Sequence, residues 1–282
     1  MIRKLIAVGV ACGLMLIGCS GTGGADPFYF FDLHANREIG RETLSERLQT
    51  NRMVLVGEYH SMMVHHQVQL EIIKMLHASG VSVAIGMEMF RSDSQPDLNR
   101  WVSGQMSEAA FKPVFFDNWN YDWQLYGGIL NYARAQKIPI VGLNVPREIT
   151  QQVAKQGFQS LSPEQKAALS DITCRVDAEY MAYIRRAFGD HAHGDLDFTN
   201  FCEAQLVWDN AMAANALAYL KTHPDVIMII LAGTGHVRKQ AIPAQVEKRQ
   251  DLPMTVLLPE VPDRIQRGLV DHTDADYLVR HP

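Results

Sequence analysis

Polar residues of the kinds that bind ligands or catalyse reactions follow four short hydrophobic runs of this sequence. Each run ends in a glycine, and the polar side chains come within a few residues of it. They are Glu58, His60, Glu88, Asn144, Arg147 and His236. Imidazole and carboxylate groups together could bind a divalent metal, act as general acid and base, or hold an anionic ligand beside the arginine. The simpler alternative is that the glycines only form turns after strands.

The hydrophobic runs themselves predict buried strands. They are continuous apolar stretches that alternate with helical patterns, which is typical of a parallel sheet covered on both faces. The expected strands are residues 53–57, 81–85, 138–141, 226–231 and 254–258. Because the carboxyl ends of parallel strands meet at one edge of the sheet, the polar residues after the first four strands should converge there. The predicted fold is α/β, a three-layer α/β/α domain with a mostly parallel sheet.

A long helical stretch separates the third expected strand from the fourth. Residues 148–223 contain a helix-capping signal at Ser162 and an Ala-rich helical pattern near their end. A simple strand–helix–strand crossover does not need so much chain. No linker rich in Pro, Gly or Ser delimits the stretch, so we expect a helical insertion within one domain over residues 28–282. Within it, Asp209 could orient His60 or His236, or be a surface or capping acid.

Composition and motifs exclude several function classes. The chain has 282 residues and a formal net charge of -5, and no run of Lys or Arg exceeds two residues, so nucleic acid is not an expected partner. Hydrophobic residues make up 47% and charged residues 20%, which favours a folded domain over a disordered chain. The sequence lacks the HExxH, CxxC and GxSxG motifs and a complete GxGxxG fingerprint, so nucleophilic hydrolysis and dinucleotide binding have no clear candidate residues.

The first residues have the pattern of a bacterial lipoprotein signal. Two positive charges precede an apolar run over residues 5–17, which is too short to span a bilayer, and small residues flank Cys19. We expect a signal peptide over residues 1–18, lipidation of Cys19 and a lipidated, flexible tether over residues 19–27. Ser20 favours sorting to the outer membrane of a bacterial cell envelope. An ordinary secretory signal cleaved nearby is the alternative.

Two cysteines remain after this segment, Cys174 and Cys202. In an oxidising periplasm they could form a disulfide and close a loop. Two separate buried thiols are the alternative, because disulfide geometry is too strict for sequence to decide between them.

Several short motifs together resemble one protein family. They lie between Thr50 and Pro259 and read Gly57-Glu58-x-His60, His65-His66-x-x-Gln69, Glu88-Met-Phe90, Trp119 with Trp123-x-x-Tyr126, Asn144-x-Pro146-Arg147, Gln205-x-x-Trp208-Asp209-x-x-Met212-Ala213 and Gly235-His236-Val237. In combination they resemble the ChaN-like haem-binding lipoproteins, whose superfamily also holds the erythromycin esterase and TraB/Tiki proteins. The resemblance implies an iron-regulated envelope lipoprotein with paired haems between two protomers. It also implies an α/β/α domain with a helical insertion.

The chain departs from the pattern of that family at two places. Ser61-Met62-Met63 stands where acidic or amide residues often follow Gly-Glu-x-His, which argues against a metal-assisted hydrolytic role. Ala241-Ile242-Pro243 stands in place of Gly-Ile-Pro, which is a mild change.

Haem needs an apolar slot, an axial donor to iron and cations for its propionates. Residues that could form the slot are Met62, Met63, Met87, Met89 and Phe90. For Met89 and Phe90, packing in the hydrophobic core is the favoured alternative. The candidate ligands are Tyr59, His65, His66, Tyr126 and, in a loop of the insertion, His193. Methionine is a weak ligand for ferric iron, so a tyrosine or histidine of residues 59–66, or Tyr126, is the expected donor.

Geometry limits two of these choices. Adjacent helical residues point about 100° apart, so at most one of His65 and His66 should face the crevice, and the other should lie at the surface. The aromatic residues between the second and third strands fit a core or an interface better than a ligand platform, and they are Trp119, Tyr121, Trp123 and Tyr126.

We therefore predict a haem-binding envelope lipoprotein with a role in iron or haem acquisition. It would form a homodimer when loaded with haem, and an outer-membrane haem receptor would be its partner. One alternative is a metal-dependent or His/Glu-assisted hydrolase that uses the same crevice, with a divalent metal in the first case. Another is an interaction protein with a vestigial site.

Overall fold

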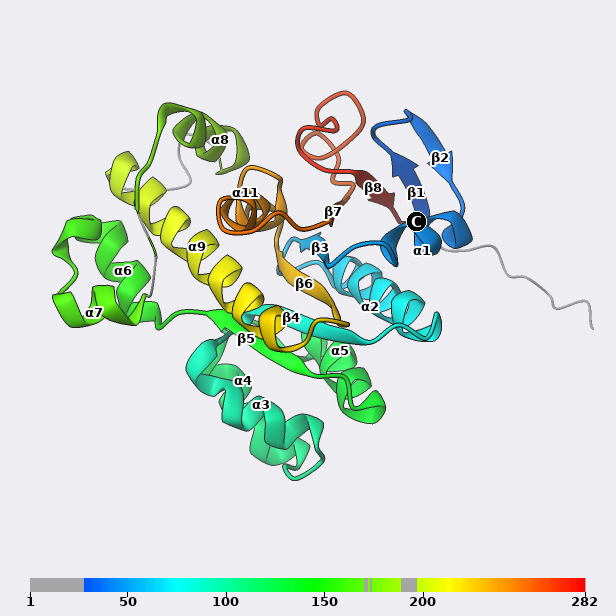
Figure 1. The fold of residues 1–282 in the computed structure, drawn as a ribbon, viewed down its shortest axis with the longest axis horizontal. Coiled ribbons are helices and arrows are strands. Elements are labelled where there is room, and N and C mark those ends of the chain that lie inside the picture. The colour runs from blue at the N-terminus through cyan, green and yellow to red at the C-terminus, as the bar shows by residue number, and fades with distance from the viewer. Residues whose placement is uncertain (1–27, 170–171, 173, 189–196, 282) are drawn as a thin grey trace, which may run out of the picture.

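The protein folds around an eight-stranded sheet (Figure 1). The computed structural model describes residues 28–169, 172, 174–188 and 197–281. The strands are β1 (Tyr29–Asp32), β2 (Arg37–Ile39), β3 (Met53–Glu58), β4 (Val83–Arg91), β5 (Ile140–Asn144), β6 (Ile227–Gly233), β7 (Met254–Pro259) and β8 (Tyr277–Arg280). Their order in the sheet is β2-β1-β8-β7-β3-β6-β4-β5. All pairs from β8 to β5 are parallel, and β1 is antiparallel to both of its neighbours.

The predicted α/β fold class is confirmed. The five expected strands correspond to β3, β4, β5, β6 and β7. Strand β4 continues further than expected, to Arg91, so Glu88 lies within the strand and not after it. The sequence did not predict β1, β2 or β8. These strands have only three or four residues, and their pairing joins the two ends of the described chain.

Side chains alternate between the two faces of the sheet. In β3, Val54 and Val56 belong to one hydrophobic core, whereas Met53 and Leu55 belong to another. The first core is covered by α1 (Arg41–Leu48), α2 (Met63–Ala78), α3 (Gln95–Val102), α4 (Glu108–Asn118) and α5 (Trp123–Gln136). Successive residues of a strand point to opposite faces, so an entirely apolar strand must be buried on both.

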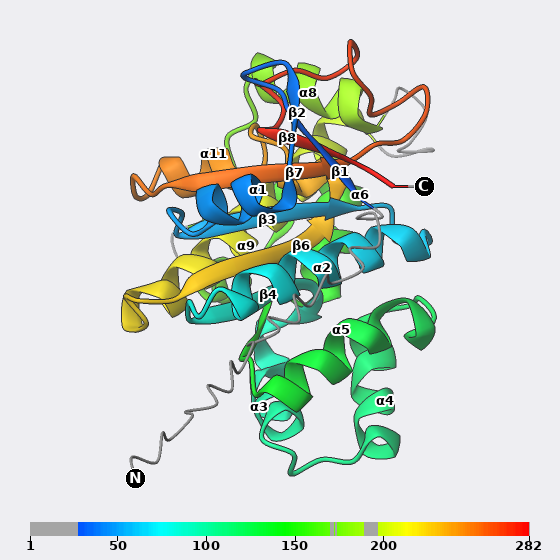
Figure 2. The ribbon, with the colours of Figure 1, turned by 90° about the vertical axis from the view of Figure 1, so that its right-hand side faces the viewer.

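The second face is covered by α9 (Phe198–Thr222), α10 (Thr234–Val237) and α11 (Ile242–Glu247). Figure 1 shows α9 and α11 on one side of the sheet and α2 and α5 on the other. Figure 2, turned by 90°, shows β7, β3 and β6 lying one beside the next between these helices. The molecule therefore has the three layers that the sequence predicts.

Further helices lie between β5 and β6, where the sequence predicts a helical insertion. They are α6 (Arg147–Gln156), α7 (Pro163–Ala168) and α8 (Ala178–Phe188), followed by α9. The capping signal at Ser162 is realised, because its side chain accepts from the Gln165 N–H while the Gln165 side chain accepts from the Ser162 N–H. Small cores of their own pack α6 and α8 against α9.

Some of the expected features lie outside the described residues, namely the signal peptide, Cys19, the tether and His193. Cys174 and Cys202 are both free thiols. Burial raises the pKa of the Cys174 thiol to about 12 and that of Cys202 to about 11. The described helices include none with the length and hydropathy needed to cross a membrane.

Candidate functional site

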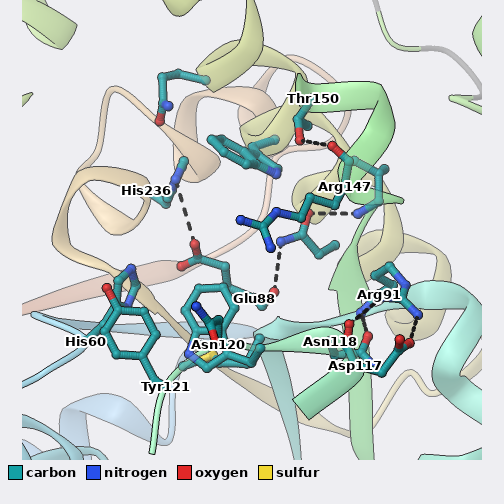
Figure 3. A pocket seen from close by; sticks show the side chains of 16 residues that line it. His60, Glu88, Arg91, Asp117, Asn118, Asn120, Tyr121, Arg147, Thr150 and His236 are labelled. Atoms are coloured by element: carbon teal, nitrogen blue, oxygen red, sulfur yellow. Dashed lines mark hydrogen bonds and ion pairs between the residues drawn. The ribbon is translucent and has the colours of Figure 1, made fainter. Parts of the chain in front are cut away.

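A pocket of about 540 Å³ opens where β3, β4, β5 and β6 end (Figure 3). Five of the predicted site residues line it, and they are His60, Glu88, Asn144, Arg147 and His236. The two remaining carboxylates, Glu58 and Asp209, lie behind the pocket and contact its histidines. The structure thus brings together residues that are far apart in the sequence, as expected for the carboxyl edge of a parallel sheet.

Glu58, the last residue of β3, is a buried carboxylate among three donors. Its Oε1 accepts from the Tyr126 hydroxyl at 2.6 Å and lies 2.7 Å from His60 Nδ1. Its Oε2 lies 2.9 Å from His66 Nδ1. Burial opposes the negative charge of Glu58, but the hydrogen bonds of His60 and His66 outweigh burial and lower its pKa to about 2. Glu58 is therefore ionised and fixes the orientation of His60.

His236 has a similar carboxylate partner. Its Nδ1 lies 2.7 Å from Asp209 Oδ1, and Asp209 Oδ2 accepts from the Tyr180 hydroxyl at 2.6 Å. Burial disfavours the charged imidazole, but the attraction of Glu88 and Asp209 outweighs it and raises the pKa of His236 to about 9. His236 is therefore protonated at neutral pH. Asp209 thus orients His236, one of the two histidines considered for it.

Glu88 lies between the two histidines. Its Oε2 accepts from the Gly233 N–H at 2.7 Å, and its Oε1 lies 3.9 Å from His236 Nε2. A side chain at Gly233 would place its Cβ 3.1 Å from His60 Cε1, so the glycine lets His60 approach β6 closely. Asn144 Nδ2 donates to the Glu88 carbonyl at 2.9 Å and fixes this part of β4.

The cations of the pocket differ in their pairing. Arg91 contacts Asp117 at 2.6 Å and Asp93 at 3.2 Å. Arg147, by contrast, has no ion-pair partner within the described part of the chain, and Figure 3 shows its guanidinium pointing into the pocket. One positive charge of the pocket is therefore not balanced by a neighbouring residue.

The aromatic group divides between the pocket and the core. Trp119 and Tyr121 line the pocket, with ring centroids 5.0 and 5.2 Å from that of His60. Trp123 and Tyr126 are buried in the first core. The prediction of a core or an interface is therefore correct for Trp123 and Tyr126. Trp119 packs against the same core and also lines the pocket, while Tyr121 lines the pocket and is 38% exposed.

The prediction that one of His65 and His66 lies at the surface is wrong. Their exposed fractions are 0% and 2%. His66 contacts Glu58 and Tyr126, whereas His65 Nδ1 accepts from the Tyr59 N–H at 2.8 Å on another side of α2. Burial, followed by the nearby His281 and His66, lowers the pKa of His65 to about 4. Both rings are covered because the first turn of α2 is enclosed on two sides.

The other residues expected to contact haem differ in how far they are buried. Tyr126 is fully buried, and burial together with the charge of Glu58 raises the pKa of its phenol far above the ordinary value. Its position therefore does not favour a bond to iron. Tyr59 is half-buried, and its hydroxyl has no hydrogen-bond partner among the described residues. Met62 is half-buried and Met63 is 41% exposed.

The remaining slot residues have core positions. Met87, Met89 and Phe90 are buried in the first core, which agrees with the core packing favoured for Met89 and Phe90, although Met89 also lines the pocket. Across the described residues, no three His, Cys, Asp or Glu side chains are grouped in a way that would hold a metal ion.

Sequence reasoning gave no role to several residues of the site. They are Arg91, Asn118, Thr150, Tyr180, Gln205 and Trp208. Gln205 and Trp208 belong to a motif of the resemblance, which was a signal that they lie near Asp209. Arg91 was missed because β4 was expected to end earlier. Tyr180 lies far from Asp209 in sequence, and no local pattern links them.

Comparison with known proteins identifies the family. The model of haem-binding uptake proteins of the Tiki superfamily, ChaN, matches residues 44–246. The chain belongs to this ChaN-like haem-binding family.

Solved structures share the fold at low sequence identity. ChaN of Campylobacter jejuni, solved with cofacial haem, superposes with a TM-score of 0.69 at 19% identity, covering 90% of this chain and 97% of that one. The type III effector HopBA1 gives 0.51 at 17% identity, covering 86% and 92%. An erythromycin esterase in an open conformation gives 0.48 at 15% identity, covering 84% and 78%.

One curated relative also matches part of the sequence. Protein RETICULATA-RELATED 5 of Arabidopsis thaliana, a chloroplastic protein, is 24% identical over 128 residues. The match covers 43% of this chain but only 17% of the relative, so it bears on a segment and not on the whole plant protein.

Proposed function

We propose that this protein binds haem, with Tyr59 as the axial ligand, and forms a dimer around a pair of haems. The observation that supports haem binding is the family match over residues 44–246. The structurally similar ChaN of Campylobacter jejuni binds haem cofacially, which supports the paired arrangement. Haem would supply an iron atom with an axial position that a tyrosinate can take.

Tyr59 is the candidate ligand whose position suits this role best. His65, His66 and Tyr126 are buried and hold hydrogen bonds inside the protein. Tyr59 is half-buried with an unpartnered hydroxyl within the described residues, and the exposed Met63 follows it at the start of α2. A free phenol beside apolar side chains fits the donor and the flat apolar contact that haem requires.

We further propose that the chain acts in iron or haem acquisition at a bacterial envelope. A lipid attached to Cys19 would anchor it at the outer membrane, and residues 19–27 would form the tether. A haem receptor of the outer membrane would be its partner. The pattern of the first residues supports this proposal.

A haem titration followed by absorption spectroscopy tests the ligand. We expect a Soret band that shifts and saturates at a fixed ratio of haem to protein. Tyr59→Phe should shift the band and weaken binding by about tenfold, since it removes the iron ligand. Tyr29→Phe, at an exposed tyrosine of β1, is the matched control and should behave like wild type.

Two results would contradict the proposal in different ways. A saturable band that is identical in wild type and Tyr59→Phe would reject Tyr59 as the ligand. A wild-type protein without any saturable band would reject haem binding.

A second function, hydrolysis assisted by histidine and glutamate, is favoured by the two oriented histidines. His60 and His236 are each held by a buried carboxylate, and Glu88 lies between them. Such pairs fix an imidazole for proton transfer, and a protonated His236 would stabilise negative charge that develops on a substrate. Hydrolysis of p-nitrophenyl acetate and p-nitrophenyl phosphate should then be lost in His60→Gln and His236→Gln but kept in His223→Gln. Equal rates in all four proteins would contradict this function.

A further inference from the structure

We propose that the pocket contains an oxyanion subsite formed by Arg147, the first turn of α6 and Gln205. It would bind the carboxylate or phosphate group of a small ligand. This inference goes beyond the proposed haem binding, because Tyr59 is not among the residues that line the pocket.

The charges of the pocket leave Arg147 without a counter-charge. Glu88 lies 3.9 Å from the protonated His236, and Arg91 contacts two aspartates. Arg147 also lines the pocket but has no ion-pair partner in the described ranges. An arginine is a planar, permanently charged donor that can bind two oxygens of a carboxylate or phosphate at once. Its direction in Figure 3 places that donor group inside the pocket.

Helix α6 adds backbone donors beside Arg147, its first residue. The N-cap residue is Pro146, and no side chain caps this end of the helix. The first N–H groups of a helix have no partner within the helix, and the helix dipole adds positive potential there. Helix N-termini accordingly bind anions, and here an arginine side chain occupies the same place.

Gln205 gives an independent indication of a ligand. It is 4% exposed, and it reaches the pocket from α9. Its Oε1 is buried and accepts no hydrogen bond from any described residue. A buried amide oxygen that accepts no hydrogen bond is costly in free energy and uncommon in native proteins. A ligand group that donates a hydrogen bond to Gln205 Oε1, such as the hydroxyl of hydrogen phosphate, would remove that cost.

The size and walls of the pocket define the ligand class. A volume of about 540 Å³ is in the range of small-molecule sites. Trp119, Tyr121 and Trp208 supply apolar walls, while His60 and His236 supply further polar groups. The expected ligand is therefore a small molecule with one oxyanion for Arg147 and a polar group for the histidines.

Calorimetric titration of the full chain in detergent, without haem, tests the subsite with inorganic phosphate and with succinate as probes. We expect one site per chain, with an affinity that falls as salt is added. Arg147→Gln should weaken binding by about tenfold or more, since it removes a charged hydrogen-bond donor. Gln205→Leu should weaken the binding of phosphate by a smaller factor, because the hydroxyl of hydrogen phosphate can donate to Gln205 Oε1. Arg264→Gln, at an exposed arginine outside the pocket, is the matched control and should leave binding unchanged.

The oxyanion could be a propionate of haem or a group of a separate small molecule. Titrations with haem and with haem dimethyl ester distinguish the two, since the ester has no free propionates. If Arg147 holds a propionate, Arg147→Gln weakens haem but not the ester, and phosphate competes with haem. If the ligand is a separate small molecule, Arg147→Gln leaves haem affinity unchanged and phosphate binds equally with or without haem. Both results support the subsite.

The subsite is overturned if phosphate and succinate give no binding and Arg147→Gln leaves both haem compounds unaffected. Tyr59→Phe separates this failure from a failure of the proposed function. That variant should lose haem affinity and keep the binding of phosphate and succinate.

Discussion

Glu58 is a single buried charge on which several side chains depend. His60, His66 and Tyr126 all direct a polar atom at its carboxylate. We expect Glu58→Gln to lower the free energy of unfolding by about 3 kcal/mol, because removing one partner leaves buried polar groups without their counter-charge. Urea denaturation measures the effect. Glu46→Gln, at an exposed position of α1, should be neutral, and equal stability of both variants would refute this role of Glu58.

His236 should make the free energy of unfolding depend on pH in the alkaline range. The pKa of His236 is about 9 in the folded protein, against an ordinary value of 6.5. A raised pKa contributes stability that is fully present below pH 6.5 and is lost as the pH rises through about 9. Unfolding free energies measured from pH 6.5 to 9 should therefore fall less steeply in His236→Gln than in wild type. His223→Gln, at an exposed ring, should keep the wild-type slope, and an unchanged slope in His236→Gln would contradict the assigned pKa.

Glu58 should act at the opposite end of the pH scale. Its pKa of about 2 lies below the ordinary value of 4.5. A lowered pKa contributes stability that is present above pH 4.5 and is lost as the pH falls through about 2. Denaturation between pH 4.5 and 2 should show a loss of stability in wild type that is smaller in Glu58→Gln. Parallel curves for the two proteins would show that another carboxylate is responsible.

At the scale of elements, the contact between β4 and β5 determines where Glu88 lies. The register of this pair shifts between Met87 and Arg91. The irregularity brings the Arg91 carbonyl close to Gly142, where an added Cβ would meet the carbonyl oxygen at 2.4 Å. The absence of a side chain at Gly142 therefore allows the close approach of Arg91 that accompanies this register shift.

Substitution of that glycine tests the role of the strand contact. Gly142→Ala should destabilise the protein by roughly 1 to 3 kcal/mol, because backbone atoms must move apart. Thermal unfolding measures the change. Gly128→Ala on α5 is the control, since its nearest neighbour would lie 3.8 Å from the new Cβ, and alanine favours a helix. A Gly142→Ala protein as stable as Gly128→Ala would refute the close contact.

The sequence predicted the central elements well because their burial is visible in the order of residues. Strands such as β3 and β6 are apolar throughout, so their ends and the polar residues after them could be located. Strand β8 and the antiparallel pair β1 and β2 were missed, since strands of three or four residues are too short to show a comparable run of apolar residues.

Some features of the site depend on tertiary contacts that no local pattern in the sequence predicts. The burial of His65 and His66 follows from what packs on both sides of the first turn of α2, which periodicity alone does not reveal. The pair of Tyr180 and Asp209 joins α8 to α9 through tertiary packing. The position of Asp209 beside a histidine was one of two alternatives predicted for it, and no local pattern distinguished that role from a surface or capping acid.

At the scale of the whole molecule, haem and dimerisation should be thermodynamically linked. A haem pair between two protomers binds the dimer more tightly than the monomer, so loading must raise the dimer population. Sedimentation velocity should show a monomer without haem and a dimer at full loading. Tyr59→Phe should remain monomeric at the same haem concentration. A wild-type protein that stays monomeric at full loading would remove the paired arrangement.

The proposed lipid on Cys19 should determine whether the whole protein is found in the membrane fraction. Cys19→Ala should move the protein from the membrane fraction to the soluble fraction, because an acyl chain on Cys19 is the expected membrane attachment. Fractionation of cells with both forms measures the change, and Cys12→Ala is a control within the same leader. A Cys19→Ala protein found wholly in membranes would contradict lipidation as the means of attachment.

The strand order has a consequence for the nascent chain. Strand β3 pairs only with β6 and β7, which begin at Ile227 and Met254. During synthesis, β3 leaves the ribosome long before either partner. Until β6 and β7 follow, it is an apolar strand whose two edges have no hydrogen-bonded neighbour. Pairing over such long sequence separations is slow and exposes the chain to aggregation. The centre of this sheet therefore closes only after the chain has been made as far as β7, and a chain cut short before Ile227 cannot complete it.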